Sequence, residues 1–394
     1  MIKVIIVGGE HHNGLNLARI FGLNNLNVDA VVVGDKKSSF IAKSKFVNRV
    51  YFFNTEQKAL DFILSHYSVE QNKPFIIPYS DAAALLLDKR LDEFKNFNCP
   101  SISGKSGAIA DLMNKQQQYE FAVQHDIKMA HSSILKLKLY DDSSLCGFTL
   151  YPYILKPNIS ATGKKSDIQV CYTADELNNA LRLFIDKGYD EVLVQEFLKV
   201  DYEALIVGVI YKNNPINDFV VNKVIRKWPN DTGCGTYNHL IADENIIQQC
   251  VSLLNIIKSI GYCGPIDVEV FVVDNKIYLN ELNLRNSGGD YKSLSQAFYY
   301  PYWWCKDYLG EPYNNTYAIS ENIFSITEMA DFNHVIDKRI KYRLWKKQFK
   351  QAQNHALYFK GDMKPYRFVM RRNRLKLIVK MLLPKRILQK VQKV

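Results

Sequence analysis

Short apolar runs alternate with amphipathic stretches over the first hundred residues. Each run is continuous and short, which is typical of strands buried on both faces of a parallel sheet. Strands that alternate with helices predict right-handed crossovers and an α/β unit, which we place at residues 1–104. The predicted strands are Ile2–Val7, Val28–Val33 and Phe75–Ile77, and the predicted helices are Gly14–Asn24 and Thr55–His66.

A helical link at 105–131 leads into a small mixed region at 132–198. Thr173 and Glu176 have the spacing of a capping box, which predicts the start of a helix that runs to Lys187. Three apolar runs surround this helix and predict strands at Tyr151–Lys156, Ile168–Tyr172 and Glu191–Glu196.

From residue 199 the pattern changes to longer strands joined by turn residues. The predicted hairpins are Tyr202–Tyr211 with Ile216–Ile225 and Ile266–Val273 with Lys276–Asn283, separated by a helix at Asp243–Ile260. We therefore expect an antiparallel unit at 199–312, a C-terminal extension at 313–363 and a basic tail at 364–394. The fold class is a combination of α/β and α+β.

The second hairpin carries the residues that point most directly to chemistry. Side chains alternate along a strand, so Glu281 and Asn283 lie on one face, and folding back at Asp274-Asn275 brings Glu269 opposite Glu281. Facing carboxylates repel each other unless a cation lies between them, and oxygen ligands suit Mg²⁺ that also holds phosphate oxygens. The alternative is a solvated polar face of the strand.

Composition and charge exclude several classes of protein. Apolar residues make up 47% and charged residues 23% of the 394 residues, as in an ordinary globular protein. The seven scattered cysteines form no CxxC pair, which argues against a zinc site or a disulfide framework and predicts reduced thiols in a cytoplasm. The first apolar run is too short for a signal peptide, and no run approaches the length of a membrane span.

The net charge of +11 belongs to the tail. Residues 364–394 contain eleven Lys or Arg and no acidic residue, so the rest of the chain is balanced at 40 basic and 40 acidic residues. We therefore do not expect the part of the chain before the tail to bind nucleic acid. The tail alternates apolar and basic residues, which favours peripheral contact with the anionic inner face of a membrane. A helix packed on the body and a tail that contacts RNA are the alternatives.

The hairpin resembles the ATP-grasp superfamily, whose signature is an acidic residue followed about a dozen residues later by E-x-N-x-R. Here the signature reads Glu269, then Glu281-Leu282-Asn283-Leu284-Arg285, with Leu284 where the family usually has proline. The resemblance implies the ATP-grasp fold, with a pre-ATP-grasp N-terminal domain, a small lid subdomain and an antiparallel C-terminal subdomain. It also implies ATP and Mg²⁺ as cofactors, with Mn²⁺ as a substitute, and Glu269, Glu281 and Asn283 as metal ligands.

Nucleotide contacts follow from the same resemblance. Lys156 ends a strand and Lys115 opens the linking helix, where relatives carry phosphate-binding lysines; alone, Lys115 would be a solvated surface residue. The segment 158–165 resembles the loop that closes over the phosphates, and 194–198 resembles the hinge beside adenine. Glu203 matches the ribose contact, although a glutamate on an exposed strand edge explains it equally. The implied ATP-binding residues are Lys115, Lys156, Ser160, Thr162, Gly163, Gln195, Glu196, Phe197, Leu198 and Glu203.

Catalytic and substrate contacts are implied at two further places. Relatives hold the acceptor carboxylate near the end of the first hairpin, which here offers Lys223 and Arg226, while Arg285 would stabilise the developing negative charge. The loop after the first strand and the end of the third strand face the cleft, although Asp81 equally suits a helix cap. The predicted substrate-binding residues are Gly9, Glu10, Asp81 and Ser287.

These features predict an ATP-dependent carboxylate–amine ligase that forms an amide through an acyl phosphate and ADP. General likeness favours an amino acid or amine joined to a cell-envelope or surface-polysaccharide precursor. A cytosolic amino-acid or dipeptide ligase and a non-catalytic nucleotide-binding regulator are the alternatives. An NAD-linked oxidoreductase would require a glycine fingerprint that Gly8–Gly14 lacks. A dimer is compatible with the sequence, which does not define the oligomeric state.

Overall fold

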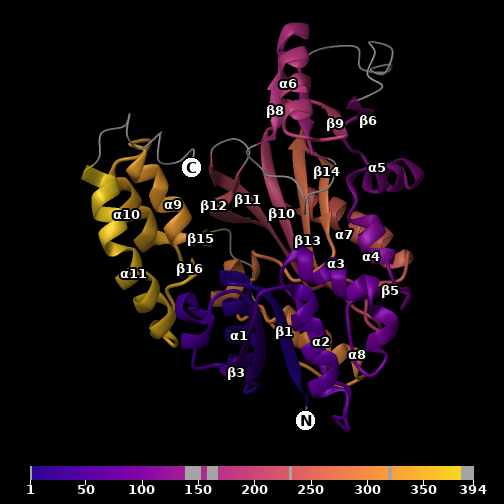
Figure 1. The fold of residues 1–394 in the computed structure, drawn as a ribbon, viewed down its shortest axis with the longest axis vertical. Coiled ribbons are helices and arrows are strands. Elements are labelled where there is room, and N and C mark those ends of the chain that lie inside the picture. The colour runs from indigo at the N-terminus through magenta and orange to yellow at the C-terminus, as the bar shows by residue number, and fades with distance from the viewer. Residues whose placement is uncertain (1, 138–151, 158–166, 230–232, 318–321, 383–394) are drawn as a thin grey trace.

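The computed structural model describes residues 2–137, 152–157, 167–229, 233–317 and 322–382 (Figure 1). Ser160, Thr162 and Gly163 of the predicted phosphate loop lie outside the described residues. The described chain forms a four-stranded parallel sheet, a four-stranded antiparallel sheet and a larger eight-stranded sheet. The expected combination of α/β and α+β units is confirmed.

The N-terminal sheet has the strand order β3-β2-β1-β4, and all its pairs are parallel. Alternate residues of β1 face opposite sides, so Ile5 and Val7 pack in the core with α2 and α3, while Val4 and Ile6 pack in the core with α1. The predicted parallel sheet is confirmed, and β3 is an additional strand. The elements are β1 (Val4–Gly9), α1 (His12–Leu23), β2 (Val28–Val33), β3 (Val47–Phe53), α2 (Glu56–Tyr67), β4 (Phe75–Pro78) and α3 (Asp81–Lys89).

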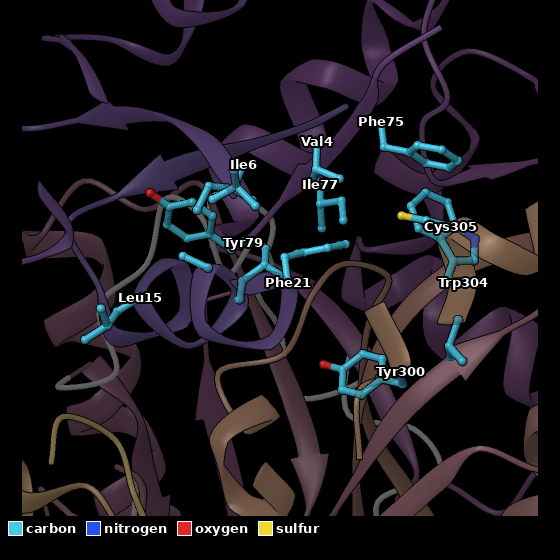
Figure 2. Close-up of a cluster of buried hydrophobic side chains, with 14 of the residues drawn as sticks. Val4, Ile6, Leu15, Phe21, Phe75, Ile77, Tyr79, Tyr300, Trp304 and Cys305 are labelled. Carbon is cyan, nitrogen blue, oxygen red and sulfur yellow. The ribbon is translucent and has the colours of Figure 1, made fainter. Parts of the chain in front are cut away.

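One hydrophobic core joins the N-terminal sheet to the rest of the chain (Figure 2). Phe21 of α1 and Phe75 of β4 lie in this core with Trp304 of α8 (Tyr300–Tyr308), and the Phe75 and Trp304 ring centroids are 5.4 Å apart. Val207 of the large sheet belongs to the same cluster. Because buried contacts between the units fix their relative position, the loop after β1 is held against the large sheet.

The small sheet has the order β6-β9-β7-β8, and α6 packs on it. The predicted start of α6 is confirmed, since the Thr173 hydroxyl accepts from the Glu176 N–H at 3.2 Å. In Figure 1 this unit projects from the body at the top of the view. Its elements are β6 (Ser132–Lys136), β7 (Tyr153–Lys156), β8 (Gln169–Cys171), α6 (Ala174–Asp186) and β9 (Glu191–Glu196).

The large sheet runs β14-β13-β10-β11-β12-β15-β16, and β5 pairs with the start of β13. Both predicted hairpins are present, and Asp274 and Asn275 have φ of 48° and 58°, as a tight two-residue turn requires. Helices α4, α5 and α7 pack on one face. The elements are β5 (Ser101–Ile102), α4 (Ala108–Leu112), α5 (Lys115–Gln124), β10 (Tyr202–Ile210), β11 (Phe219–Trp228), β12 (Cys234–Ile241), α7 (Glu244–Ser259), β13 (Tyr262–Val273) and β14 (Lys276–Asn283).

The C-terminal segment continues the large sheet and returns to the N-terminal unit. β15 (Phe324–Ile326) and β16 (Asn354–His355) add two strands, and α9 (Glu328–Ile336), α10 (Tyr342–Gln351) and α11 (Met363–Leu382) surround them. Tyr366 and Val369 of α11 pack on the core of the N-terminal unit. The start of the basic tail is therefore a helix packed on the body, and its contact with a membrane stays a prediction. None of the described helices combines the length and apolar character needed to cross a bilayer.

Glu328 of α9 is a buried carboxylate that makes folding sensitive to pH. It accepts from the Leu357 and Tyr358 N–H groups, and burial raises its pKa to about 7 from an ordinary value of 4.5. His355 lies 3.7 Å away and its pKa is lowered by burial to about 4, so both groups are neutral between about pH 4 and 7.

A Glu328→Gln variant is therefore expected to gain stability relative to the wild type as the pH rises. Between pH 4.5 and 7 the native carboxyl holds a proton that the unfolded chain has lost, so its contribution to stability falls through this window. The difference in Tm between variant and wild type, measured by scanning fluorimetry from pH 5 to 8, should become more positive. Glu311→Gln, at an exposed ion pair, should give a flat difference. A flat profile for Glu328→Gln would contradict the assignment.

Candidate active site

A cavity of 1660 Å³ lies between the small sheet, the large sheet, the loop after β1 and the C-terminal segment. This volume exceeds that of a typical single-ligand pocket, which is about 300–1,000 Å³, and so provides room for two substrates. The N-terminal unit contributes Glu10 to Asn13, and the C-terminal segment contributes residues that include Met329, Leu357 and Val369.

Acidic and amide side chains gather where β13 and β14 pair. Glu269 stands opposite Glu281 in the ladder, as predicted, and Asp267 stands opposite Asn283. A bulge between Glu269 and Val270 places Asn280 beside this group, where its amide donates to the Glu269 carboxylate at 3.2 Å. All five residues line the cavity, so the hairpin presents three carboxylates and two amides to one space.

This donor set fits a hard divalent cation. One carboxylate oxygen of Asp267, Oδ1, is buried and has no hydrogen-bond partner among the described residues, so it remains available as an acceptor beside this group. No cluster of three or more His, Cys, Asp or Glu among the described residues suits a metal held by the protein alone. A cation here would therefore be coordinated by two glutamates, one amide and oxygens from outside the protein, as Mg²⁺ commonly is.

Two lysines reach the cavity from the small sheet and the linking helix. The Lys156 ammonium is buried and donates to Gln195 Oε1 at 2.8 Å, and Gln195 in turn donates to the Ser132 hydroxyl at 2.8 Å. Burial lowers the pKa of Lys156 to about 7; Lys115 adds to this effect, while Glu281 and Glu269 oppose it. Lys115 begins α5 and donates to the Pro157 carbonyl at 3.3 Å. Gln195 therefore positions Lys156 beside Lys115.

The segment after β9 forms a largely apolar wall of the cavity. Phe197 and Leu198 line it, and the N–H groups of Glu196 and Phe197 donate to the carbonyls of His131 and Pro152. The N–H of Leu198 donates to no backbone carbonyl within the described ranges. Glu203 lines the same wall and accepts from the Lys227 ammonium at 2.6 Å.

Arg285 is held between two carboxylates. Its Nε donates to Asp81 Oδ1 at 2.6 Å and its Nη1 to Asp267 Oδ2 at 3.0 Å, and both neighbours raise its pKa. Asp81 is thus not the cap of α3, since the Ser80 hydroxyl occupies that position. The ion pairs fix Arg285 at the cavity with its guanidinium plane defined.

Two residues of the polar region at β11 lie differently from expectation. Lys223 is not among the residues that line the cavity, and its ammonium lies over the Tyr202 ring instead, 4.3 Å from the centroid. Arg226 does line the cavity, but its guanidinium is bound by Asp331 at 2.8 and 2.7 Å and by Gln348. Lys223 and Arg226 are three positions apart, so an alternating strand does not direct both side chains to one face, and the irregular register beside Arg226 begins only after Lys223.

Three predicted substrate contacts are also placed differently. Ser287 is fully buried, does not line the cavity and accepts from the Gly289 N–H at 2.7 Å, so it shapes the turn there. Gly9 ends β1 outside the cavity lining. Glu10 lines the cavity, but its Oε1 accepts from the Phe40 and Ile41 N–H groups, so it holds that segment in place.

Sequence reasoning missed several residues that line the cavity. Asp267 and Glu269 are two positions apart on one strand, so alternation alone could have indicated Asp267. Lys292 and the wall from α9 to α11 gave no comparable signal, because only long-range packing brings them here. Lys292 is 3% exposed, and burial lowers its pKa to about 8.

Comparison with known proteins agrees with this architecture. A protein-family model described as an ATP-grasp domain matches residues 120–294. The N5-carboxyaminoimidazole ribonucleotide synthase of Haemophilus influenzae is 30% identical over 112 residues, which cover 26% of this chain and 29% of that protein. The formate-dependent phosphoribosylglycinamide formyltransferase of Wolinella succinogenes is 22% identical over 290 residues, which cover 72% of this chain and 70% of that protein.

Solved structures show the same fold. The N5-carboxyaminoimidazole synthetase of Staphylococcus aureus, complexed with ADP, superposes with a TM-score of 0.62 at 16% identity, covering 81% of this chain and 80% of that one. The chain spans less than a third of the length of the Haemophilus relative. The match at residues 120–294 and this superposition therefore agree that the chain has the ATP-grasp fold.

Proposed function

We propose that the protein is an ADP-forming ligase that uses ATP to join a carboxylate to an amine. The observation that carries this proposal is the pairing of Glu269 with Glu281, beside Asn283, in a cavity that also holds two phosphate-binding candidates. The solved relative with ADP and the family match support ATP as the energy source. Mg²⁺ on Glu269, Glu281 and Asn283 would supply charge neutralisation for the phosphates.

The nucleotide would bind between the small and large sheets. The wall at Phe197 and Leu198 offers an apolar surface to adenine, with the Leu198 N–H as a donor. Glu203, already in contact with Lys227, would accept from ribose hydroxyls. Lys115 and Lys156 would neutralise the phosphates, and Gln195 keeps the Lys156 ammonium directed into the cavity.

The acceptor would bind on the other side of the acidic group. A carboxylate oxygen of the acceptor attacks the γ-phosphorus, ADP leaves, and an acyl phosphate forms. An amine then attacks the acyl carbon, and phosphate leaves. Arg285, held by Asp81 and Asp267, provides a fixed positive charge for the negative charge that develops in both steps. Arg226 is bound by Asp331 and would position the wall of the cavity that α9 to α11 form.

For the acceptor, two chemical classes deserve direct comparison. The sequence favours an envelope or surface-polysaccharide precursor, whereas the names of the curated relatives refer to ribonucleotide and glycinamide compounds. Both classes share a carboxylate or bicarbonate that accepts the phosphoryl group and an amine that attacks the acyl phosphate. We therefore propose the function at the level of carboxylate–amine ligation, and amino-acid ligation belongs to the same proposal.

The test is phosphate release from ATP by the full chain with Mg²⁺. A panel should contain amino acids, uronic acids, formate and bicarbonate, each with and without amines such as aminoimidazole ribonucleotide and glycinamide ribonucleotide. We expect at least one carboxylate–amine pair to stimulate release and to yield an amide by mass spectrometry. Binding of MgATP without release for any pair would favour a nucleotide-binding regulator and contradict the ligase proposal.

A further inference from the structure

We propose that Lys292 anchors the carboxylate of the acceptor and the acyl phosphate formed from it. This role rests on the ligase function proposed above and names the residue that defines the acceptor end of the site. The chemical class of ligand is a carboxylate, or the mixed anhydride of a carboxylate and phosphate.

Lys292 lies at the acidic centre of the cavity although its backbone is remote from the hairpin. It belongs to the 3-10 segment Asp290–Gln296 and is 3% exposed. Its side chain lies next to the preceding turn, since a Cβ atom added to Gly289 would lie 3.4 Å from the Lys292 Cδ atom. The acidic neighbours that act on its ammonium are Asp267 and Glu269, and both line the cavity.

The Lys292 ammonium differs from the other cations of the cavity in its lack of a partner. Lys156 is hydrogen-bonded to Gln195, Lys227 is paired with Glu203, and Arg285 is paired with two aspartates. Within the ranges that the structure describes, the Lys292 ammonium makes no hydrogen bond and no ion pair. The Lys292 side chain is almost entirely buried and lines the cavity, so an anion bound there would remove the unfavourable free energy of an unpaired charge.

The electrostatic neighbourhood places this anion on the acceptor side. In the ladder, the Asp267–Asn283 pair follows the Glu269–Glu281 pair on the side where β14 ends and the chain leads to the segment that carries Lys292. The acidic neighbours of Lys292 are Asp267 and Glu269, whereas those of Lys156 are Glu281 and Glu269, so Lys292 lies nearer the Asp267 end of the acidic group. Lys292 also follows the turn at Gly288, whose carbonyl contacts His12 of the N-terminal unit at 3.2 Å. In the cavity, Lys156 lies on the side of the nucleotide and Lys292 lies on the side of the acceptor.

The ammonium takes part in both steps without forming a bond. When the carboxylate oxygen bonds to the γ-phosphorus, the bond from that phosphorus to ADP breaks and ADP leaves with the electron pair. When the amine nitrogen bonds to the acyl carbon, the carbon–oxygen bond breaks and phosphate leaves with the electron pair, while the amine loses its proton to water. Lys292 stays protonated and neutralises first the carboxylate and then the departing phosphate.

The experiment uses acetyl phosphate and MgADP as probes, because the acceptor need not be known. By reversal of the first step, the full chain should form ATP and acetate. Lys292→Met should raise the KM for acetyl phosphate at least about 30-fold, which is the loss of one charge-assisted contact. The affinity for MgADP, measured by calorimetry, should stay within about threefold. Lys292→Arg should recover much of the loss, and Lys306→Met, at a surface pair outside the cavity, should change neither value.

Thermal unfolding separates this role from a structural one. Removing an unpartnered buried charge should leave the Tm of Lys292→Met equal to or about 2 °C above that of the wild type. A lower Tm for both Lys292→Met and Lys292→Gln, a parallel loss of MgADP affinity or an unchanged KM for acetyl phosphate would each overturn the proposal. Wild-type protein that binds MgADP but forms no ATP also overturns it. Wild-type protein that binds no MgADP overturns the proposed function instead.

Discussion

Replacing Glu281 by glutamine is expected to lower kcat for phosphate release by about 10²–10³-fold, since charge stabilisation by a bound cation amounts to several kcal/mol. The amide keeps the shape of the side chain but removes one of the two facing negative charges. Raising the Mg²⁺ concentration should restore part of the rate, because the defect lies in metal affinity. The rate should be measured as phosphate release with the most active pair from the substrate panel.

A stability measurement provides the internal control for this variant. Glu281→Gln removes repulsion from Glu269 and also attraction to Lys156, so its unfolding temperature should stay within about 2 °C of the wild type. Glu311→Gln, at an exposed ion pair remote from the cavity, should leave kcat unchanged. Turnover by Glu281→Gln that is nearly intact at low Mg²⁺ would show that the metal ligands have been assigned to the wrong residues.

Replacing Arg19 by methionine should reduce the free energy of unfolding by about 3–5 kcal/mol, because it leaves a buried carboxylate without its positive partner. The Arg19 guanidinium is fully buried and donates to Asn16, Asp362 and the carbonyls of Ala356 and Leu357. These bonds tie α1 to the chain just before α11. Urea unfolding followed by far-UV circular dichroism measures the loss.

Arg90→Met is the matched control for this prediction. Arg90 also pairs with two carboxylates, Asp61 and Glu93, but both are half exposed. Exposed ion pairs contribute about 0–1 kcal/mol, so this variant should remain close to the wild type. Equal losses for the two arginine variants would mean that burial does not decide the strength of these contacts.

The local pattern was sufficient to predict the centre of the site. The strands that carry Glu269 and Glu281 are joined by two residues at Asp274-Asn275, so alternation and turn chemistry together define which side chains meet. The parallel N-terminal sheet was equally accessible, since its strands are continuous apolar runs. β3 escaped notice because polar Asn48 and Arg49 interrupt its apolar pattern and both are exposed.

Departures from a regular ladder limit what alternation can predict within a strand. A period of two assumes an unbroken ladder, and the register of β11 with β12 is irregular on both sides of Arg226. The same cause hid Asn280, which the bulge in β14 brings beside Glu269. The sequence carries no strong sign of these extra residues, because a bulge depends on how two neighbouring strands twist.

Long-range packing accounts for the remaining part of the site. Lys292 and the wall from Met329 to Val369 line the cavity beside the part of the large sheet that β15 and β16 extend. Their own segments look like ordinary surface sequence. Residues whose role depends on contacts far along the chain are therefore found from the structure and not from a motif.

The bonds of Arg19 also impose an order on the life of the protein. Its partner Asp362 lies 343 residues later in the chain. During synthesis, the first domain therefore emerges from the ribosome with an arginine whose carboxylate and carbonyl partners do not yet exist. A chain that terminates before residue 356 leaves this buried cation without those partners.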